Sequence, residues 1–176
     1  MRTALDLLTQ YAEYHRDRRN IATHFVGVPL IVFAVGALLA RPGFDLGGLA
    51  LSPAWVLFGL AALWYLSRHL VLGLATSAAV GVLIWLGHLA AAGSTGAWLA
   101  TGIGAFVVGW IIQFVGHYYE GRKPAFVDDL VGLLVGPMFV VAEAMFAAGW
   151  NREMLARIEQ KAGPTIVRDL ANAARS

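Results

Sequence analysis

Four long runs of apolar residues, almost free of charge, constrain this sequence more than any other feature. They cover residues 21–40, 49–67, 70–92 and 97–116. A helix needs about 20 apolar residues to cross the hydrocarbon core of a bilayer, and each run has about that length. Each run is therefore predicted to be a transmembrane helix. The expected fold class is an all-α integral membrane protein.

The composition supports this expectation and excludes other classes. Hydrophobic residues make up 59% of the 176 residues and charged residues 14%, whereas an average soluble domain has about 25% charged residues. The absence of cysteine excludes disulfides and thiolate metal ligands. The net charge is only +2 and the arginines adjoin the apolar runs, which indicates membrane orientation and no nucleic-acid partner.

The segment before the first run, residues 3–19, mixes apolar and polar residues at helical spacing. This pattern predicts an amphipathic helix that lies in the membrane interface. Its acidic residues Asp6, Glu13 and Asp17 argue against a cleaved signal peptide. We therefore expect the segment to be retained within a single membrane domain of residues 1–176.

The segment 126–150 is long enough to span a membrane, but it contains three acidic residues and Pro137. With four spans and a cytoplasmic N-terminus, most basic residues of the loops lie inside. A fifth span would place the basic residues of 151–176 outside, against the positive-inside rule. We therefore predict a re-entrant or interfacial helical hairpin broken at Pro137, a cytoplasmic tail over 151–176, and both termini in the cytoplasm.

Histidines are the first candidates for chemistry. Four of the five are predicted to lie near one membrane face: His15, His24, His69 and His117. His88 falls near the opposite end of its span. His15 and His24 are nine residues apart, which would place them on opposite sides of one continuous helix. A break at the charged stretch 16–20 would let both rings converge; a solvated His15 and a hydrogen-bonded His24 are the alternative interpretation.

The end of the fourth run carries Gln113, His117 and Glu120 at spacings of four and three residues, hence on one helical face. An imidazole and a carboxylate at this spacing can bind one divalent metal. A polar collar at a helix end has the same pattern, and the pattern alone does not separate the two. Glu143 lies within an apolar segment, where a carboxylate marks a functional or paired site, with an arginine such as Arg122 as a candidate partner.

Two blocks of motifs resemble a known family. The first is Tyr11-Ala-Glu-Tyr-His15 with Asn20, His24 and Pro29; the second is Gln113-Phe-Val-Gly-His117 with Glu120, Arg122-Lys123-Pro124-Ala125, Asp128, Leu130, Pro137 and Glu143. In these motifs, in order along nearly the whole chain, the sequence resembles the membrane 2-hydroxy fatty acid dioxygenases. Residues 41–100 match only in hydropathy, and His69 lies outside the matching motifs.

The resemblance implies an Fe(II)-dependent α-oxidation, in which a 2-hydroxy fatty acid and dioxygen give a fatty acid one carbon shorter and carbon dioxide. It implies His15, His24 and His117 as metal ligands and, together with Glu120, as catalytic residues. The candidate substrate-binding residues are Asn20, Gln113, Arg122 and Lys123, and the secondary candidates are Glu143, Asp128 and His69. Membrane lipid is an expected partner, and homo-oligomerisation stays open. The expected location is the inner membrane of a bacterium, or the endoplasmic reticulum in eukaryotic relatives, with a cytoplasmic active site.

Three other functions stay open at this level. A b-type heme could be held between His24 and His117, and a Soret band would identify it. A small transporter or channel could use Glu143 as a gate, although the polar residues gather at one face and form no continuous path through the second and third spans. A non-catalytic scaffold would tolerate substitution of the histidines.

Overall fold

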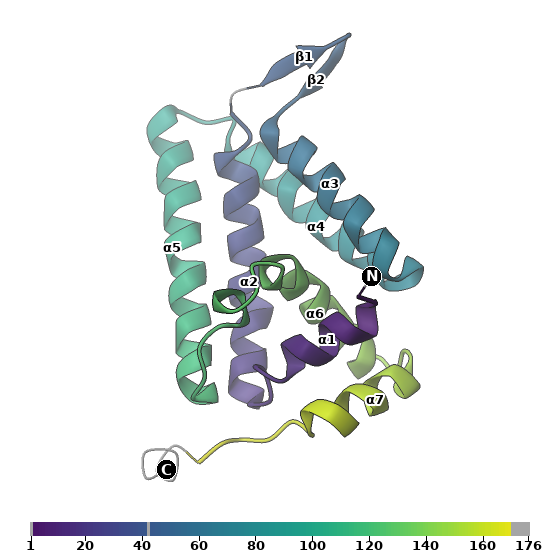
Figure 1. The fold of residues 1–176 in the computed structure, drawn as a ribbon. Helices are drawn as coiled ribbons and strands as arrows, with labels where there is room; N and C mark the ends of the chain where they lie inside the picture. Colours follow the sequence, from purple (N-terminus) through teal and green to yellow (C-terminus); the bar gives the residue numbers. More distant parts are fainter. Residues whose placement is uncertain (1, 42, 170–176) are drawn as a thin grey trace. The chain divides into compact units, whose positions relative to one another are not determined.

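The computed structural model describes residues 2–41 and 43–169, and these residues are mostly helical (Figure 1). In chain order the elements are α1 (Ala4–Ala12), α2 (Arg18–Leu38), β1 (Phe44–Leu46), β2 (Leu49–Leu51), α3 (Pro53–Arg68), α4 (Leu70–Ala90), α5 (Thr95–Glu120), the 3₁₀ helix η1 (Ala125–Val127), α6 (Gly132–Ala147) and α7 (Arg152–Ala162). The prediction of a helical protein is confirmed, with the small β1–β2 sheet as an addition to it.

Three helices of the described residues are long and apolar enough to cross a membrane: α2, α4 and α5. They correspond to the predicted spans 21–40, 70–92 and 97–116. The remaining predicted span, 49–67, is wrong at its start, because α3 begins at Pro53 and has only 16 residues. At 1.5 Å per residue α3 is about 24 Å long, shorter than a hydrocarbon core of about 30 Å. The count of four spans is therefore not confirmed.

The start of this predicted span forms a β-hairpin instead. β1 and β2 pair antiparallel, with Phe44 opposite Leu51. Gly47 and Gly48 connect them with φ angles of 64° and 89°, a left-handed conformation that favours glycine and that tight hairpin turns require. The sequence of β2 is apolar and only Ser52 separates it from α3, so hydropathy alone did not distinguish the strand from the start of a helix.

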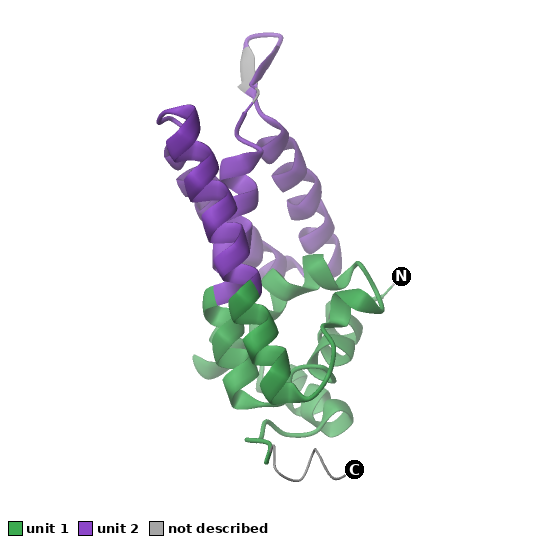
Figure 2. Cartoon of the chain, turned by 90° about the vertical axis from the view of Figure 1, so that its left-hand side faces the viewer, with its two compact units in different colours: residues 1–26, 111–176 green, residues 27–110 purple. Residues whose placement is uncertain are grey.

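The chain divides into two compact units (Figure 2). We call residues 1–26 and 111–176 the first unit and residues 27–110 the second unit. In the second unit, α3 and α4 pack along one another (Figure 1). A Cβ atom at Gly73 would lie 2.6 Å from the carbonyl oxygen of Tyr65, so this close approach of α4 to α3 requires glycine.

In the first unit, α1 packs against both α6 and α7. The break predicted at Pro137 is wrong, because α6 continues through Pro137. The chain bends instead after α6, where Gly149 has a φ of 88° and the direction of the chain turns by 118° between α6 and α7. This pair is either a broken span or a re-entrant loop, so the described helices include at most four spans.

The region predicted as a cytoplasmic tail, 151–176, contains structure. Its first part is α7, which Asn151 caps by accepting a hydrogen bond from the backbone N–H of Met154. Residues 163–169 then run back along the residues between α1 and α2, with an isolated parallel bridge between Asp17 and Ile166. The last part of the predicted tail, 170–176, lies outside the described residues.

Candidate metal centre

A helix break brings His15 and His24 together as expected, but it lies at residues 13–17 and not at 16–20, so the helix predicted over 3–19 is wrong at its end. α1 ends at Ala12 and α2 begins at Arg18, so His15 lies in the turn and His24 lies on α2. The ring centroids of the two histidines are 4.4 Å apart, with the planes at 79°. The turn therefore brings together two rings that one continuous helix would have pointed apart.

His117 from the end of α5 completes a buried trio. Its ring centroid lies 4.9 Å from that of His15 and 5.4 Å from that of His24. Each of the three histidines offers one ligand nitrogen, and these nitrogens lie within 4.8 Å of one another. Among the described residues this is the group of side chains that could hold a metal ion.

Backbone carbonyl oxygens fix the Nδ1 atoms of two of the three rings. His15 Nδ1 lies 2.7 Å from the carbonyl oxygen of Tyr11, and His24 Nδ1 lies 2.8 Å from that of Asn20. A carbonyl oxygen only accepts hydrogen bonds, so Nδ1 carries the proton in both rings and Nε2 keeps its lone pair. This tautomer is the one in which Nε2 can bind a metal, with the backbone fixing the ring.

The chemistry of the trio fits a metal. Burial lowers the pKa of His15 well below its usual value, and the neighbouring His24 and His117 lower it further, so His15 is neutral at neutral pH, as a ligand must be. His15 Nε2 and His117 Nδ1 are buried without a hydrogen-bond partner in the described part of the chain. Buried polar atoms without partners are costly, and a metal ion would satisfy both.

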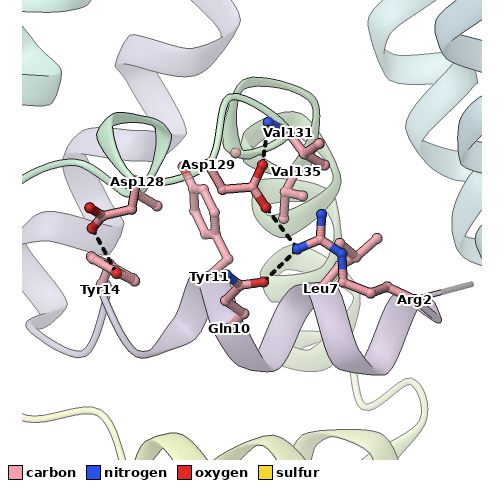
Figure 3. A pocket seen from close by; sticks show the side chains of 11 residues that line it. Arg2, Leu7, Gln10, Tyr11, Tyr14, Asp128, Asp129, Val131 and Val135 are labelled. Atoms are coloured by element: carbon pink, nitrogen blue, oxygen red, sulfur yellow. Dashed lines mark hydrogen bonds and ion pairs between the residues drawn. The ribbon is translucent and has the colours of Figure 1, made fainter.

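Tyr11 covers one side of the trio. Its ring stacks on His15 with centroids 4.0 Å apart and planes at 5°, and Phe139 of α6 lies 5.0 Å from Tyr11. Tyr11 also lines a pocket, whose wall includes Tyr14 and Asp128 (Figure 3). The Tyr14 hydroxyl donates a hydrogen bond to Asp128 there. Asp128, predicted as a secondary site residue, therefore belongs to the pocket and not to the trio.

Glu120 is buried next to this site, but its two carboxylate oxygens are engaged. Oε2 accepts hydrogen bonds from the backbone N–H groups of Arg16 and Asp17 and from the side-chain amide of Asn20, at 2.9, 2.8 and 3.1 Å. Oε1 accepts two from the guanidinium of Arg168, at 3.0 and 2.8 Å. The group of residues that could hold a metal does not include Glu120. Its carboxylate binds the backbone of the turn between α1 and α2 instead.

Asn20 and Gln113, predicted to bind substrate, are buried. Gln113 lies one helical turn before His117 on the same face of α5. Both polar atoms of its side-chain amide, and Oδ1 of Asn20, have no hydrogen-bond partner within the described residues. These atoms are donors and acceptors that a bound molecule could use.

The two basic residues predicted to bind substrate lie at the surface. Arg122 donates a hydrogen bond to the carbonyl oxygen of Glu13 at 3.0 Å, and Lys123 forms an ion pair with Asp128 at 2.5 Å. The structure does not bring either side chain into the trio.

The remaining secondary candidates are not members of the trio. His69 belongs to the second unit, where its Nδ1 accepts a hydrogen bond from the backbone N–H of Leu72 and caps α4. Glu143 lies 3.8 Å from the guanidinium of Arg16. The arginine expected near Glu143 is therefore Arg16 and not Arg122.

Sequence reasoning missed two arginines of the site. Arg16, adjacent to His15, is buried, although its place beside an apolar run indicates a loop residue that orients the chain. Arg168 binds Glu120 from the far end of the chain. The position of Arg16 between two histidines was a usable signal, but no local pattern marks Arg168.

A buried trio of imidazoles among apolar helices defines the class of this protein: a helical membrane protein with a candidate metal centre. The model of a family described as "2-hydroxy-palmitic acid dioxygenase Mpo1-like" matches residues 1–148. The 2-hydroxy-palmitic acid dioxygenase MPO1 of Saccharomyces cerevisiae is 34% identical over 161 residues, which cover 88% of each chain. No solved structure gives a significant match. The chain belongs to the Mpo1-like family.

Proposed function

We propose that this protein is a non-heme Fe(II) dioxygenase that converts a 2-hydroxy fatty acid into the fatty acid one carbon shorter. The observation that carries the proposal is the convergence of three buried imidazoles, from His15, His24 and His117, in a chain of the Mpo1-like family. The relative in yeast is named for dioxygenase activity on 2-hydroxy-palmitic acid. The reaction class and a substrate of this chemistry follow from that relationship.

The donor set suits iron. Imidazole nitrogens bind iron, and three protein ligands leave coordination positions open for substrate and dioxygen. When bound, Fe(II) would supply the activation of dioxygen and the coordination of the oxygen atoms of the hydroxy acid. The reaction balances without an external reductant, because a 2-hydroxy acid and dioxygen give the shortened acid, carbon dioxide and water.

The protein's own residues would orient the substrate. Gln113 and Asn20 present buried polar atoms that have no hydrogen-bond partner among the described residues, and these atoms would bind the hydroxyl or carboxylate of the substrate. Arg122 and Lys123, at the surface, would attract the carboxylate as it approaches. The histidines lie at or near the ends of α2 and α5, so the polar head would reach them while the alkyl chain stays beside apolar helices. We place this site at the cytoplasmic face of the membrane.

The trio is a poor heme site. A heme held between His24 and His117 needs the space between the two rings for the porphyrin. The ring centroids of His24 and His117 are 5.4 Å apart, and the ring of His15 lies 4.4 and 4.9 Å from them, so the three rings pack against one another and leave no such space. The geometry therefore favours a single ion over a heme.

The proposal is tested with purified protein in detergent, reconstituted with Fe(II) without air. Iron content is measured, and 2-hydroxypalmitate is then incubated with the protein in air and followed by mass spectrometry. We expect about one iron per chain, no Soret band, and pentadecanoate as product. His117→Ala should lose both iron and product, whereas His88→Ala, in the second unit, should keep both. A Soret band, or iron-free protein with full activity, would contradict the proposal.

A further inference from the structure

The end of the described chain is attached to the turn that carries His15. We call residues 163–168 the C-terminal strap. Ile166 donates a backbone hydrogen bond to the carbonyl oxygen of Arg16 and accepts one from the N–H of Arg18, both at 2.8 Å. The strap lies beyond the residues that the family model matches, 1–148.

Side chains strengthen this attachment. The backbone N–H of Arg168 donates to the carboxylate of Asp17 at 2.8 Å, and the Arg19 guanidinium donates to the carbonyl oxygen of Arg168 at 2.8 Å. The Arg16 guanidinium donates to the carbonyl oxygen of Gly163 at 3.0 Å. Asp17 is fully buried, and hydrogen bonds from Arg19 hold its pKa at about 2, so it stays charged.

The strap also reaches the histidines through Glu120. The guanidinium of Arg168 binds Oε1 of Glu120 with two hydrogen bonds, while Oε2 holds the turn. Oε2 also accepts from the side chain of Asn20, whose backbone carbonyl oxygen fixes Nδ1 of His24. A continuous series of contacts thus runs from Arg168 through Glu120 and Asn20 to the ring of His24.

This series of contacts depends on the charge of Arg168, its most exposed member. The side chain of Glu120 is 0% exposed, whereas that of Arg168 is 31% exposed. A buried carboxylate that loses its cation retains the full cost of desolvation, so the structure around it must rearrange. This rearrangement would alter the hydrogen bonds that Glu120 accepts from the turn.

We propose that the C-terminal strap positions the metal centre, with Arg168 acting through Glu120 to hold the turn so that the imidazoles of His15 and His24 face His117. Glu120 and Arg168 are then positioning residues, and Glu120 is not a metal ligand. This inference rests on the proposed metal-dependent function. It assigns a role in that function to residues 163–168, which lie beyond the residues that the family model matches.

The test measures Co(II) binding and the visible absorption of the bound Co(II) in the full-length protein in detergent, without substrate. Arg168→Ala should weaken Co(II) binding about 10-fold and shift the absorption bands, because residues that orient ligands typically change metal affinity by 10- to 100-fold. Arg168→Lys keeps the charge and should restore part of the affinity. Arg157→Ala is the matched control, since Arg157 pairs only with the exposed Glu153 in the contacts described, and it should bind Co(II) as the wild type does.

Glu120→Gln provides a second variant that keeps the size of the side chain. It should weaken Co(II) binding by a similar factor without removing one cobalt from the stoichiometry, since a positioning residue is not a ligand. Combined with Arg168→Ala it should add little further loss, because both act through the same contacts. Thermal unfolding of each variant separates a folded protein with a distorted site from an unfolded one, and Glu120→Gln and Arg168→Lys carry the test if Arg168→Ala does not fold.

The outcomes separate this inference from the proposed function. If wild-type protein binds Co(II), His24→Ala does not, and folded Arg168→Lys, Arg168→Ala and Glu120→Gln all match the wild type, the positioning role is wrong and the metal centre stands. If wild-type protein binds no Co(II), or His24→Ala binds it equally well, the metal centre is wrong and the positioning role with it.

Discussion

The two units of the chain bury different kinds of side chain. Among the described residues, the first unit buries nine polar or charged residues: Thr9, His15, Arg16, Asp17, Asn20, His24, Gln113, His117 and Glu120. In the described part of the second unit, the buried polar or charged residues are Ser52 and Thr76. Buried charges and amides are costly in an apolar surrounding and tend to mark function. The comparison supports our proposal that the chemistry lies in the first unit, whereas the buried side chains of the second unit are mostly apolar.

We expect the largest effect from substitution of a histidine in the first unit, compared with substitution of one in the second unit. His24→Ala removes a proposed ligand and should lower both bound iron and product formation by more than about 100-fold, beyond the effect of losing a group that only orients a ligand. His69→Ala removes a cap from α4, so it should lower the free energy of unfolding by about 0.5–2 kcal/mol with iron content unchanged. Iron analysis, turnover and thermal unfolding are measured on both. Loss of iron in His69→Ala would break the comparison.

Two glycines on α5 give a matched pair for packing. A Cβ atom at Gly116, in the first unit, would lie 2.5 Å from Oδ1 of Asn20 and would also collide with Thr23, whereas one at Gly104, in the second unit, meets nothing within 4 Å. Gly116→Ala should therefore destabilise the protein by about 1–3 kcal/mol and disturb the site. Gly104→Ala should stabilise it by up to about 1 kcal/mol, because alanine favours a helix. Equal unfolding temperatures for the two variants would show that α5 does not approach α2 closely at Asn20.

A third pair of substitutions concerns buried polar side chains, Gln113 in the first unit and Thr76 in the second. Their polar atoms have no hydrogen-bond partner among the residues that the structure describes. Gln113→Leu and Thr76→Val should each raise the free energy of unfolding by about 1–3 kcal/mol, since an unsatisfied buried group is removed. Only Gln113→Leu should raise the KM for 2-hydroxypalmitate, by about 10-fold, if its amide binds the substrate. An unchanged KM in Gln113→Leu would assign that amide to structure alone.

The sequence predicts well those features that depend on neighbouring residues. Apolar length alone located α2, α4 and α5, because crossing a bilayer is a property of one continuous segment. The hairpin of β1 and β2 was missed because the residues of β2 are apolar and only Ser52 separates them from α3. Pro137 was expected to break a helix, but α6 accommodates it and the chain bends near Gly149. In both cases a local backbone conformation, and not hydropathy, decided the boundary.

The site could be predicted only in part. The spacing of His117 and Glu120 showed that they share a helical face, and the charged stretch after His15 indicated the break that lets His24 approach. Spacing does not reveal which neighbours a side chain meets, so it left open whether Glu120 shares a metal with His117 or forms a polar collar, whereas Glu120 binds the turn. The contact between Arg168 and Glu120 joins residues 48 positions apart. Such contacts depend on the tertiary fold, which no local pattern encodes.

The smallest expected effect concerns a contact in the second unit that includes no proposed site residue. The Trp98 indole N–H donates a hydrogen bond to the carbonyl oxygen of Ala37 at 2.7 Å, and the guanidinium of Arg41 lies 4.9 Å from the Trp98 ring. Trp98→Phe keeps an aromatic ring and removes the N–H, so it should lower the free energy of unfolding by about 1 kcal/mol. Iron content and the KM for 2-hydroxypalmitate should not change. A changed KM in this variant would show that the second unit also shapes the substrate site, and the division of roles between the two units would then have to be abandoned.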